Sequence, residues 1–157
     1  VRARGIARGL APAVIENLGL QRALAELASQ SKLVYNIDCT LTCGEIVAET
    51  PQAVAVQLFR ITQEAVNNAV QHGAATRVDF YHEVSDDVIH LSIRDNGCGS
   101  SNDITAQSDG LGLLSMRHRA EVLDGELLIE ANSVHSPGNQ SGICVTVTVP
   151  RKRPSHV

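Results

Sequence analysis

The chain has 157 residues, of which 43% are apolar and 19% charged, and its formal net charge is -4. This composition is typical of one globular domain with its own core, and the acidic balance argues against nucleic acid or an anionic membrane as a partner. The chain has no Trp and only two Tyr and two Phe, which argues against an aromatic platform for stacking bases.

The first part of the chain predicts two helices followed by a strand. Apolar residues recur at helical spacing over residues 6–18, with Pro12 favouring a break or a new helix start. The leucines of residues 20–32 lie on one face of a second predicted helix. Apolar and polar residues alternate in "LVYNIDC" (33–39), which predicts a strand, and "CTLTCGE" (39–45) is then expected to be a loop.

A long helix and a β-hairpin are predicted next. The helix runs from Thr50 to His72, with Thr50 as its cap, Pro51 in its first turn and Gly73 at its end. Two alternating segments (77–84 and 88–95) then predict strands joined by a short turn.

The last third predicts a loop, a helix and two strands. The Gly-, Ser- and Asn-rich residues 96–112 predict a long mobile loop, and loops of that length inside compact domains are usually functional. A helix is expected at 113–123, strands at 125–131 and 142–149, and a disordered tail at 151–157. Because several strands follow one another without helical crossovers, we expect an α+β fold: a two-layer sandwich in which helices cover one face of a mixed sheet.

Three polar side chains interrupt the long helix at spacing i, i+4, i+8: Glu64, Asn68 and His72. Each step turns the helix by about 40°, so the three form one stripe. A solvated helix face would explain this stripe equally well. The alternative is a magnesium site, because the amide oxygen of Asn68 is a hard ligand and a carboxylate one turn away can orient or deprotonate water.

The segment "DNGCG" (95–99) places a carboxylate and two glycines at the end of a predicted strand. Asp95 could accept a hydrogen bond from an exocyclic amine, and Gly97 and Gly99 would let the backbone pass close to a flat ligand. Alone, the motif is equally typical of a plain turn that leads into a loop.

The segment "DGLGL" (109–113) precedes the next predicted helix. The free amides of Gly110, Leu111 and Gly112 at a helix N-terminus would suit a phosphate, although a simple helix-entry loop looks the same. A Walker A sequence is absent, and the glycines do not stand where a Rossmann fingerprint would place them.

Taken in order, these motifs resemble a known family. A polar helix, a strand ending in D-x-G-x-G, a long loop and G-x-G opening a helix are similar to the ATP-binding domain of sensor histidine kinases, gyrase B, Hsp90 and MutL. "QEAVNNAVQH" resembles the N box, "DNGCG" the G1 box and "DGLGL" the G2 box. Residues 9–27 and "GLLSMRHRAEVLDGEL" further resemble the nitrate-sensor-like class of histidine kinases, and the likeness extends over residues 4–150.

The resemblance implies a role for each motif residue. Asn68 would ligate Mg²⁺, and Glu64 would act as a base or orient water. Asp95 would contact the adenine amine of ATP, with Gly97 and Gly99 shaping the adenine pocket. Three further residues would form the end of a lid that holds the phosphates: Gly110, Leu111 and Gly112.

Two departures from the family pattern concern the pocket. Gln71 stands where the family often has Lys, so a phosphate-neutralising charge would have to come from His72, Arg117 or Arg119. Ile143 stands where a Thr usually follows the glycine of the last strand, so the hydroxyl expected near the adenine is missing.

The resemblance also implies a reaction and a domain organisation. The domain would transfer the ATP γ-phosphoryl group to a histidine on a dimerisation helix that lies upstream of this sequence in a full-length homodimer. A response-regulator receiver domain would accept the phosphoryl group later. We expect residues 1–19 to be the end of the dimerisation hairpin and a linker, 20–150 the ATP-binding catalytic domain, and 151–157 the tail. The alternatives are an anti-sigma-factor-like serine kinase of the same fold, or a non-catalytic interaction module that has lost nucleotide binding.

The cysteines and apolar runs bear on location. Four cysteines are too few to staple a chain of this length, and Cys39 and Cys43 have no second pair with the spacing of a zinc site. We find no apolar run of membrane-spanning length and no signal peptide. We therefore expect a cytoplasmic domain with reduced thiols, which is compatible with a membrane anchor elsewhere in the full-length protein.

Overall fold

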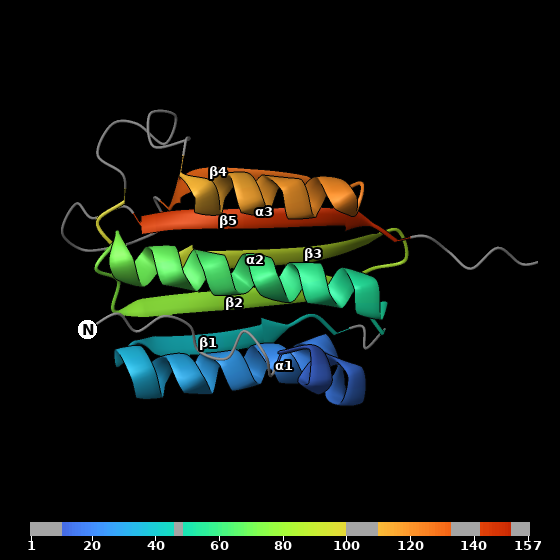
Figure 1. Ribbon diagram of the computed structural model, residues 1–157, viewed down its shortest axis with the longest axis horizontal. Helices are drawn as coiled ribbons and strands as arrows, with labels where there is room; N and C mark the ends of the chain where they lie inside the picture. The colour runs from blue at the N-terminus through green and yellow to red at the C-terminus, as the bar shows by residue number, and fades with distance from the viewer. Residues whose placement is uncertain (1–10, 46–48, 100–109, 133–141, 152–157) are drawn as a thin grey trace, which may run out of the picture.

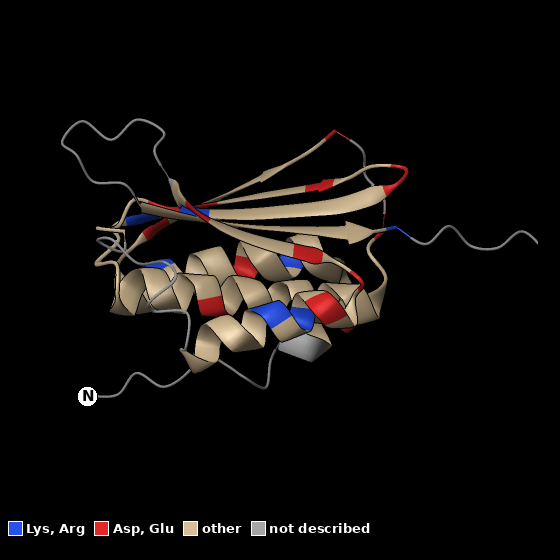
Figure 2. Cartoon of the chain, turned by 90° about the horizontal axis from the view of Figure 1, so that it is seen from above, with Lys and Arg blue, Asp and Glu red and all other residues tan. Residues whose placement is uncertain are grey.

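The computed structural model describes residues 11–45, 49–99, 110–132 and 142–151. Within these residues Figures 1 and 2 show two layers, with the helices on one face of the sheet. This confirms the expected α+β sandwich. The elements described are α1 (Ala11–Tyr35), β1 (Asp38–Cys43), α2 (Gln52–Gln71), β2 (Arg77–Val84), β3 (Val88–Asp95), α3 (Leu111–Val122), β4 (Glu126–Asn132) and β5 (Gly142–Pro150).

The strands form one mixed sheet in the order β1-β2-β3-β5-β4. β1 runs parallel to β2, and the other neighbouring pairs are antiparallel. β3 therefore lies between β2 and β5. Asp95, the last residue of β3, is paired with Val78 near the start of β2, and the preceding Arg94 is paired with Cys144 near the start of β5. The end of β3 thus lies beside the starts of two neighbouring strands.

The core lies between the sheet and the helices. Alternate residues of β2, β3 and β5 point into it because the side-chain period of a strand is two. α2 contributes side chains at intervals of three or four positions, which form one buried face. The buried residues of α2 are Ala55, Leu58, Phe59, Ile61, Thr62, Ala65, Val66 and Ala69.

The strand predicted at 33–39 is wrong. α1 continues to Tyr35, with Leu33 85% exposed, and Asn36 takes a left-handed φ of 55°. The Asn36 amide donates to the Lys32 carbonyl at 3.0 Å, which closes the last turn of the helix. A left-handed residue in this position is a common end for an α-helix. The strand begins only at Asp38 and occupies the segment expected to be a loop.

The break between the two predicted helices is confirmed. Gly19 (φ 78°, ψ 175°) is non-helical inside α1 and lies between the predicted helices at 6–18 and 20–32. Pro12 lies in the first turn of the described part of α1, which agrees with a new helix start there, and residues 1–10 lie outside the described residues.

Pro51 rather than Thr50 is the N-cap of α2, and no side chain caps that helix. The Thr50 hydroxyl is buried and has no hydrogen-bond partner within the described part of the chain. The predicted cap is therefore wrong, although the extent of α2 is close to the prediction.

The remaining predictions divide between confirmed elements and undescribed residues. The hairpin strands have the predicted bounds, and α3, β4 and β5 lie within two residues of theirs. Loop residues 100–109 and tail residues 152–157 lie outside the described residues. Among the helices described, none has both the length and the apolar character needed to cross a membrane.

Candidate functional site

The predicted site residues gather at one end of the sheet, on the left in Figure 1. Here the end of β3 meets the end of α2, because Cys98 N donates to the Gly73 carbonyl at 2.8 Å. β5 joins the same place, since Ile143 N donates to Asp95 Oδ1 at 3.2 Å. The fold thus brings residues from three separate parts of the sequence around Asp95.

Asp95 lies at the centre of this arrangement. Its side chain is on the helix-facing side of β3, and the residue is only 9% exposed. Two main-chain amides donate to Oδ1, from Gly97 at 2.8 Å and from Ile143 at 3.2 Å. Burial raises the pKa of the Asp95 carboxyl above its ordinary value, and these two amides partly offset the rise. The result is a fixed hydrogen-bond acceptor at the edge of the core.

Glycines let the backbone pack closely around Asp95. A Cβ on Gly97 would lie 2.6 Å from the Gly73 carbonyl oxygen, and a Cβ on Gly142 would overlap the main chain of Asp95. Gly99 has a φ of 65°, which a residue with a side chain rarely adopts. The glycines of the "DNGCG" motif are therefore required by the local geometry, and Gly142 joins them from β5.

The polar stripe of α2 borders the same region. Glu64 and Asn68 are half-buried, whereas His72 at the C-cap is exposed. On the sheet side of the helix, Ile61 and Ala65 are buried. A helix with one buried apolar face can thus present a carboxylate and an amide at the edge of the core. This explains why polar residues interrupt a largely buried helix.

The start of α3 lies directly against this stripe. Gly110 is the N-cap and Gly112 lies in the first turn, so the predicted helix start is moved by two residues. A Cβ on Gly112 would overlap Glu64 Oε1, which shows that the carboxylate reaches the α3 backbone. The Leu111 side chain is 85% exposed. The N-terminus of α3 and the α2 stripe therefore face each other, as an anion site between them requires.

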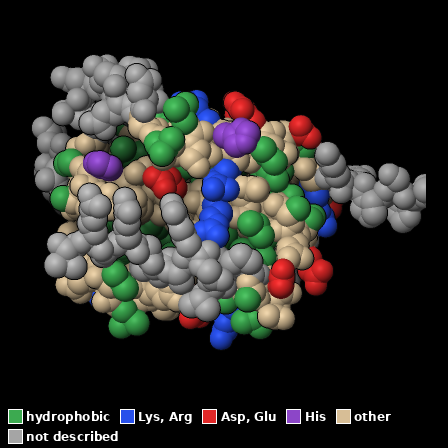
Figure 3. Space-filling view, in the orientation of Figure 1, with side chains coloured by type: hydrophobic (Ala, Val, Ile, Leu, Met, Phe, Trp, Pro, Cys, Tyr) green, Lys and Arg blue, Asp and Glu red, His purple; other side chains and the backbone are tan. Residues whose placement is uncertain are grey.

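The residues expected to neutralise phosphate charge lie on α3 and at the end of α2. Figure 3 shows Lys and Arg side chains gathered in a short column over α2 and α3. Arg119 donates to Gln57 Oε1 at 2.8 Å, which ties α3 to α2. Arg117 and His72 are exposed. Of the three cations named from the sequence, Arg119 is thus engaged with α2, and the other two face solvent.

The donor set suits Mg²⁺ bound together with a nucleotide. Mg²⁺ prefers hard oxygen ligands and usually takes one or two from the protein and the rest from phosphates and water. Asn68 provides an amide oxygen, and Glu64 provides a carboxylate one turn earlier on α2. Searched over the described part of the chain, His, Cys, Asp and Glu side chains form no group of three or more that could hold a metal ion.

Two residues of this region were not identified from the sequence. Asn96 makes three side-chain hydrogen bonds to the start of β2, and Gly142 approaches Asp95 from a strand 47 positions later in the chain. The Asn of "DNGCG" was a visible signal, because Asn often bonds to nearby backbone in turns. The close approach of Gly142 depends on the pairing of β3 with β5, which no local pattern gives.

Comparison with known proteins identifies the family of the chain. Residues 53–153 match the family described as histidine kinase-, DNA gyrase B-, and HSP90-like ATPase. The chain is 32% identical over 124 residues to the sensor histidine kinase ComP of Bacillus subtilis (strain 168), covering 78% of this chain and 16% of ComP. It is 29% identical over 144 residues to the sensor histidine kinase LiaS of the same strain, covering 92% of this chain and 39% of LiaS.

A solved structure supports the fold. The ATP-binding domain of PrrB from Mycobacterium tuberculosis matches with a TM-score of 0.63 at 24% identity, covering 82% of this chain and 90% of that one. This likeness bears on the architecture alone. The chain spans less than half the length of ComP and of LiaS.

Proposed function

The chain belongs to the family of histidine kinase-, DNA gyrase B- and HSP90-like ATPases, and from this we propose that it is the ATP-binding catalytic domain of a two-component sensor histidine kinase. The observation that carries the proposal is the meeting of three motifs at one end of the sheet. The buried carboxylate of Asp95, the polar stripe of α2 and the N-terminus of α3 lie around one place. A purine, a metal ion and a polyphosphate need these three kinds of group.

Asp95 would recognise the adenine. A carboxylate held by two main-chain amides cannot swing toward solvent, so it offers an acceptor in a defined position. The exocyclic amine of adenine donates to such an acceptor. Because Gly97 and Gly142 have no side chains, only main-chain atoms of these residues lie beside Asp95. A flat group such as adenine could therefore approach the carboxylate closely. The hydroxyl absent at Ile143 does not affect this contact, because Ile143 acts through its main-chain amide.

The phosphates would lie between α2 and the start of α3. Mg²⁺, when bound with the nucleotide, would neutralise phosphate charge. Asn68 would offer the ion its amide oxygen, and Glu64 would orient or deprotonate a water or the attacking group. The N-terminus of α3 is the positive end of the helix dipole, which favours anions. The main-chain amides that would face a phosphate there belong to Gly110, Leu111 and Gly112.

Exposed cations would complete the phosphate site. His72 and Arg117 are proposed to replace the lysine that the family often has at Gln71. Both are exposed and free to turn toward a bound anion as far as their helices allow.

In the full-length protein, we propose that the γ-phosphoryl group passes to a histidine on a dimerisation helix outside this sequence, and then to a receiver domain. Transfer of this kind depends on positioning and charge stabilisation more than on covalent chemistry by the protein. The residues described here would hold and orient the donor nucleotide. The match to two sensor histidine kinases favours this reaction over that of a serine kinase of the same fold.

Calorimetry with a non-hydrolysable ATP analogue tests the nucleotide site, and two adjacent asparagines provide a matched pair. We expect the chain to bind the analogue in the presence of Mg²⁺, and Asn68→Ala to weaken that binding by about 1–3 kcal/mol. Asn67→Ala removes the same amide from the neighbouring position of α2, which points about 100° away around the helix, and should leave affinity unchanged.

Two outcomes would contradict the proposal. If the wild-type chain binds no analogue, with or without Mg²⁺, the domain is a non-catalytic module. Equal losses for the Asn67 and Asn68 variants would show that the helix is perturbed generally and that Asn68 has no special part in holding the metal.

A further inference from the structure

We propose that Asn96 is a positioning residue for nucleotide binding, a role that rests on the proposed function and adds a residue to it. Its side chain fastens the loop after β3 to the turn between α2 and β2. It would thereby hold Asp95 and Gly97, its two neighbours in the chain, in the arrangement that receives adenine.

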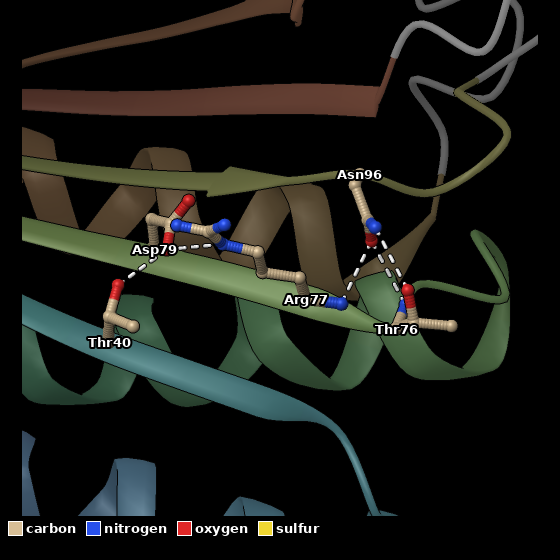
Figure 4. Close-up of polar contacts among 5 residues, drawn as sticks. All are labelled: Thr40, Thr76, Arg77, Asp79 and Asn96. Carbon is tan, nitrogen blue, oxygen red and sulfur yellow. Dashed lines mark hydrogen bonds and ion pairs between the residues drawn. The ribbon is translucent and has the colours of Figure 1, made fainter. Parts of the chain in front are cut away.

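The amide group of Asn96 uses both its acceptor and its donor. Oδ1 accepts hydrogen bonds from the main-chain amides of Thr76 at 3.0 Å and Arg77 at 2.9 Å. Nδ2 donates to Thr76 Oγ1 at 2.9 Å. Figure 4 shows the side chain reaching from the end of β3 across to the start of β2. Three contacts from one short side chain fix its position closely.

Main-chain hydrogen bonds of residues 96–98 connect the Asn96 contact with the residues around Asp95. Asn96 N donates to the Arg77 carbonyl at 3.2 Å, and Cys98 N donates to the Gly73 carbonyl at 2.8 Å. Between them, Gly97 N donates to Asp95 Oδ1. Each residue from 96 to 98 is therefore tied to a different group, and the Asn96 side chain adds three further contacts to the main-chain link with the start of β2.

The turn that Asn96 holds has a conformation that needs support. Ala74 has a φ of 47°, in the left-handed region that residues with a Cβ rarely adopt. The turn directly follows the end of α2, where the polar stripe lies. A bond from Asn96 to two consecutive amides of this turn therefore joins the α2 side of the pocket to the Asp95 side.

All three contacts use the polar end of the Asn96 side chain, which alanine lacks. Aspartate keeps the acceptor for the two main-chain amides, and its second oxygen can accept from the Thr76 hydroxyl, which then acts as the donor. Asn96 is half-buried, so water can replace part of what is lost when the side chain is removed. Its removal should therefore affect the placement of Asp95 more than the stability of the fold.

The other end of the β2–β3 pair offers a control. Ser85 Oγ accepts from Val88 N and donates to the Val88 carbonyl, both at 3.1 Å, so a short polar side chain also fastens this turn to main-chain groups. Ser85 lies at the opposite end of the strands from Asp95. Ser85→Ala thus removes a comparable anchor without touching the proposed pocket.

The test compares stability with affinity on the 157-residue chain. The variants are Asn96→Ala, Asn96→Asp, Thr76→Val and the control Ser85→Ala. Urea unfolding gives stability, and calorimetry with the non-hydrolysable ATP analogue and Mg²⁺ gives Kd. We expect Asn96→Ala and Ser85→Ala to lose similar stability, but only Asn96→Ala to raise Kd, by about tenfold. Thr76→Val keeps the two contacts of the acceptor but loses the third, and should raise Kd about two- to threefold. Asn96→Asp can keep all three contacts and should bind close to wild type.

Amide hydrogen exchange without nucleotide adds a direct readout of position. In Asn96→Ala, the amides of Gly97, Cys98 and Ile143 should exchange faster than in wild type, while those of the β2–β3 turn at Ser85 keep their wild-type rate. A merely structural role would instead lower protection throughout the sheet.

The outcomes separate this inference from the function on which it rests. If wild type binds the analogue and Asn96→Ala binds it equally well, the positioning role is wrong and the proposed function stands. Failure of the wild-type chain to bind would overturn both. Should Asn96→Ala fail to fold, Thr76→Val decides, and wild-type affinity in that variant would also overturn the positioning role.

Discussion

Asp95 and His82 are both buried ionisable residues on the helix-facing side of the sheet, yet their surroundings differ. Asp95 accepts hydrogen bonds from two main-chain amides, whereas neither ring nitrogen of His82 has a hydrogen-bond partner among the residues that the structure describes. Burial shifts the pKa of each toward the neutral form, upward for Asp95 and downward for His82, where the nearby His90 adds to the shift. The two lie four residues apart along the paired strands, roughly 13 Å.

The difference shows which buried polar group the fold is arranged to use. Around Asp95, glycines and main-chain donors from three elements converge, so the cost of burying the carboxylate is partly offset and its direction is fixed. His82 is 2% exposed, and nothing of this kind surrounds it. We infer that Asp95 belongs to a ligand site and that His82 is a cost to stability.

The largest expected effect comes from removing the Asp95 carboxylate. Asp95→Ala should weaken binding of an ATP analogue by about 1–3 kcal/mol, because the adenine amine would be left without an acceptor in a pocket closed to water. His82→Leu should leave the same Kd unchanged. Calorimetry on both variants makes the comparison.

Asp95→Asn separates the ligand contact from the fold. Its amide oxygen can still accept from Gly97 and Ile143, so the variant should unfold close to the wild-type urea concentration while binding the analogue weakly. If Asp95→Ala binds as tightly as wild type, the carboxylate does not recognise the nucleotide and the comparison with His82 loses its meaning.

A smaller effect, in stability, is expected at His82. Replacing its imidazole by leucine removes two buried polar nitrogens that have no partner and keeps a side chain of similar volume. His82→Leu should raise the free energy of unfolding by about 1–2 kcal/mol at pH 7, measured by urea unfolding. A loss of stability would show that the imidazole makes a contact that matters for the fold.

The strands that face the core could be predicted from the sequence. The bounds of β2 and β3 agree with the prediction to the residue, because one face of each strand packs on helices. Burial alternates along both strands except at Ser92, which is also buried. The alternation at 33–39 was misleading. Leu33 and Val34 are exposed on the end of α1, and the chain turns only at Asn36. A short alternating run at a helix end fits both structures, and packing decides between them.

The site could be predicted in its residues but not in its contacts. Glu64 and Asn68 share one face because helical spacing fixes that, and Asp95 ends its strand as expected. The bonds from Ile143 to Asp95 and from Asn96 to Thr76 join segments 48 and 20 positions apart. Such contacts follow from the strand order, which local patterns do not determine.

The smallest expected effect is the dependence of stability on pH. The folded-state pKa of His82 lies below that of the unfolded chain, so the unfolded chain binds the proton first as pH falls. Stability is therefore complete above the unfolded value and is lost as pH falls from about 6.5 toward the lower folded value, by at most about 1.4 kcal/mol per pH unit for one proton.

Subtracting His82→Leu from wild type isolates this group. Titrating residues that do not interact with His82, Asp95 among them, contribute equally to both proteins and cancel in the difference. His90 interacts with His82, so its share of the shift stays within the difference. Because the folded-state pKa of Asp95 is raised, its own contribution has the opposite sign: ionised and buried, Asp95 costs stability at high pH and regains it as pH falls through its folded value. Urea unfolding at pH 7.5, 6.5 and 5.5 should therefore show the advantage of His82→Leu growing as pH falls. A constant advantage over this range would mean that the imidazole becomes protonated in the folded domain as easily as in the unfolded chain. His82 would then have a partner that compensates its charge, as main-chain amides compensate the charge of Asp95.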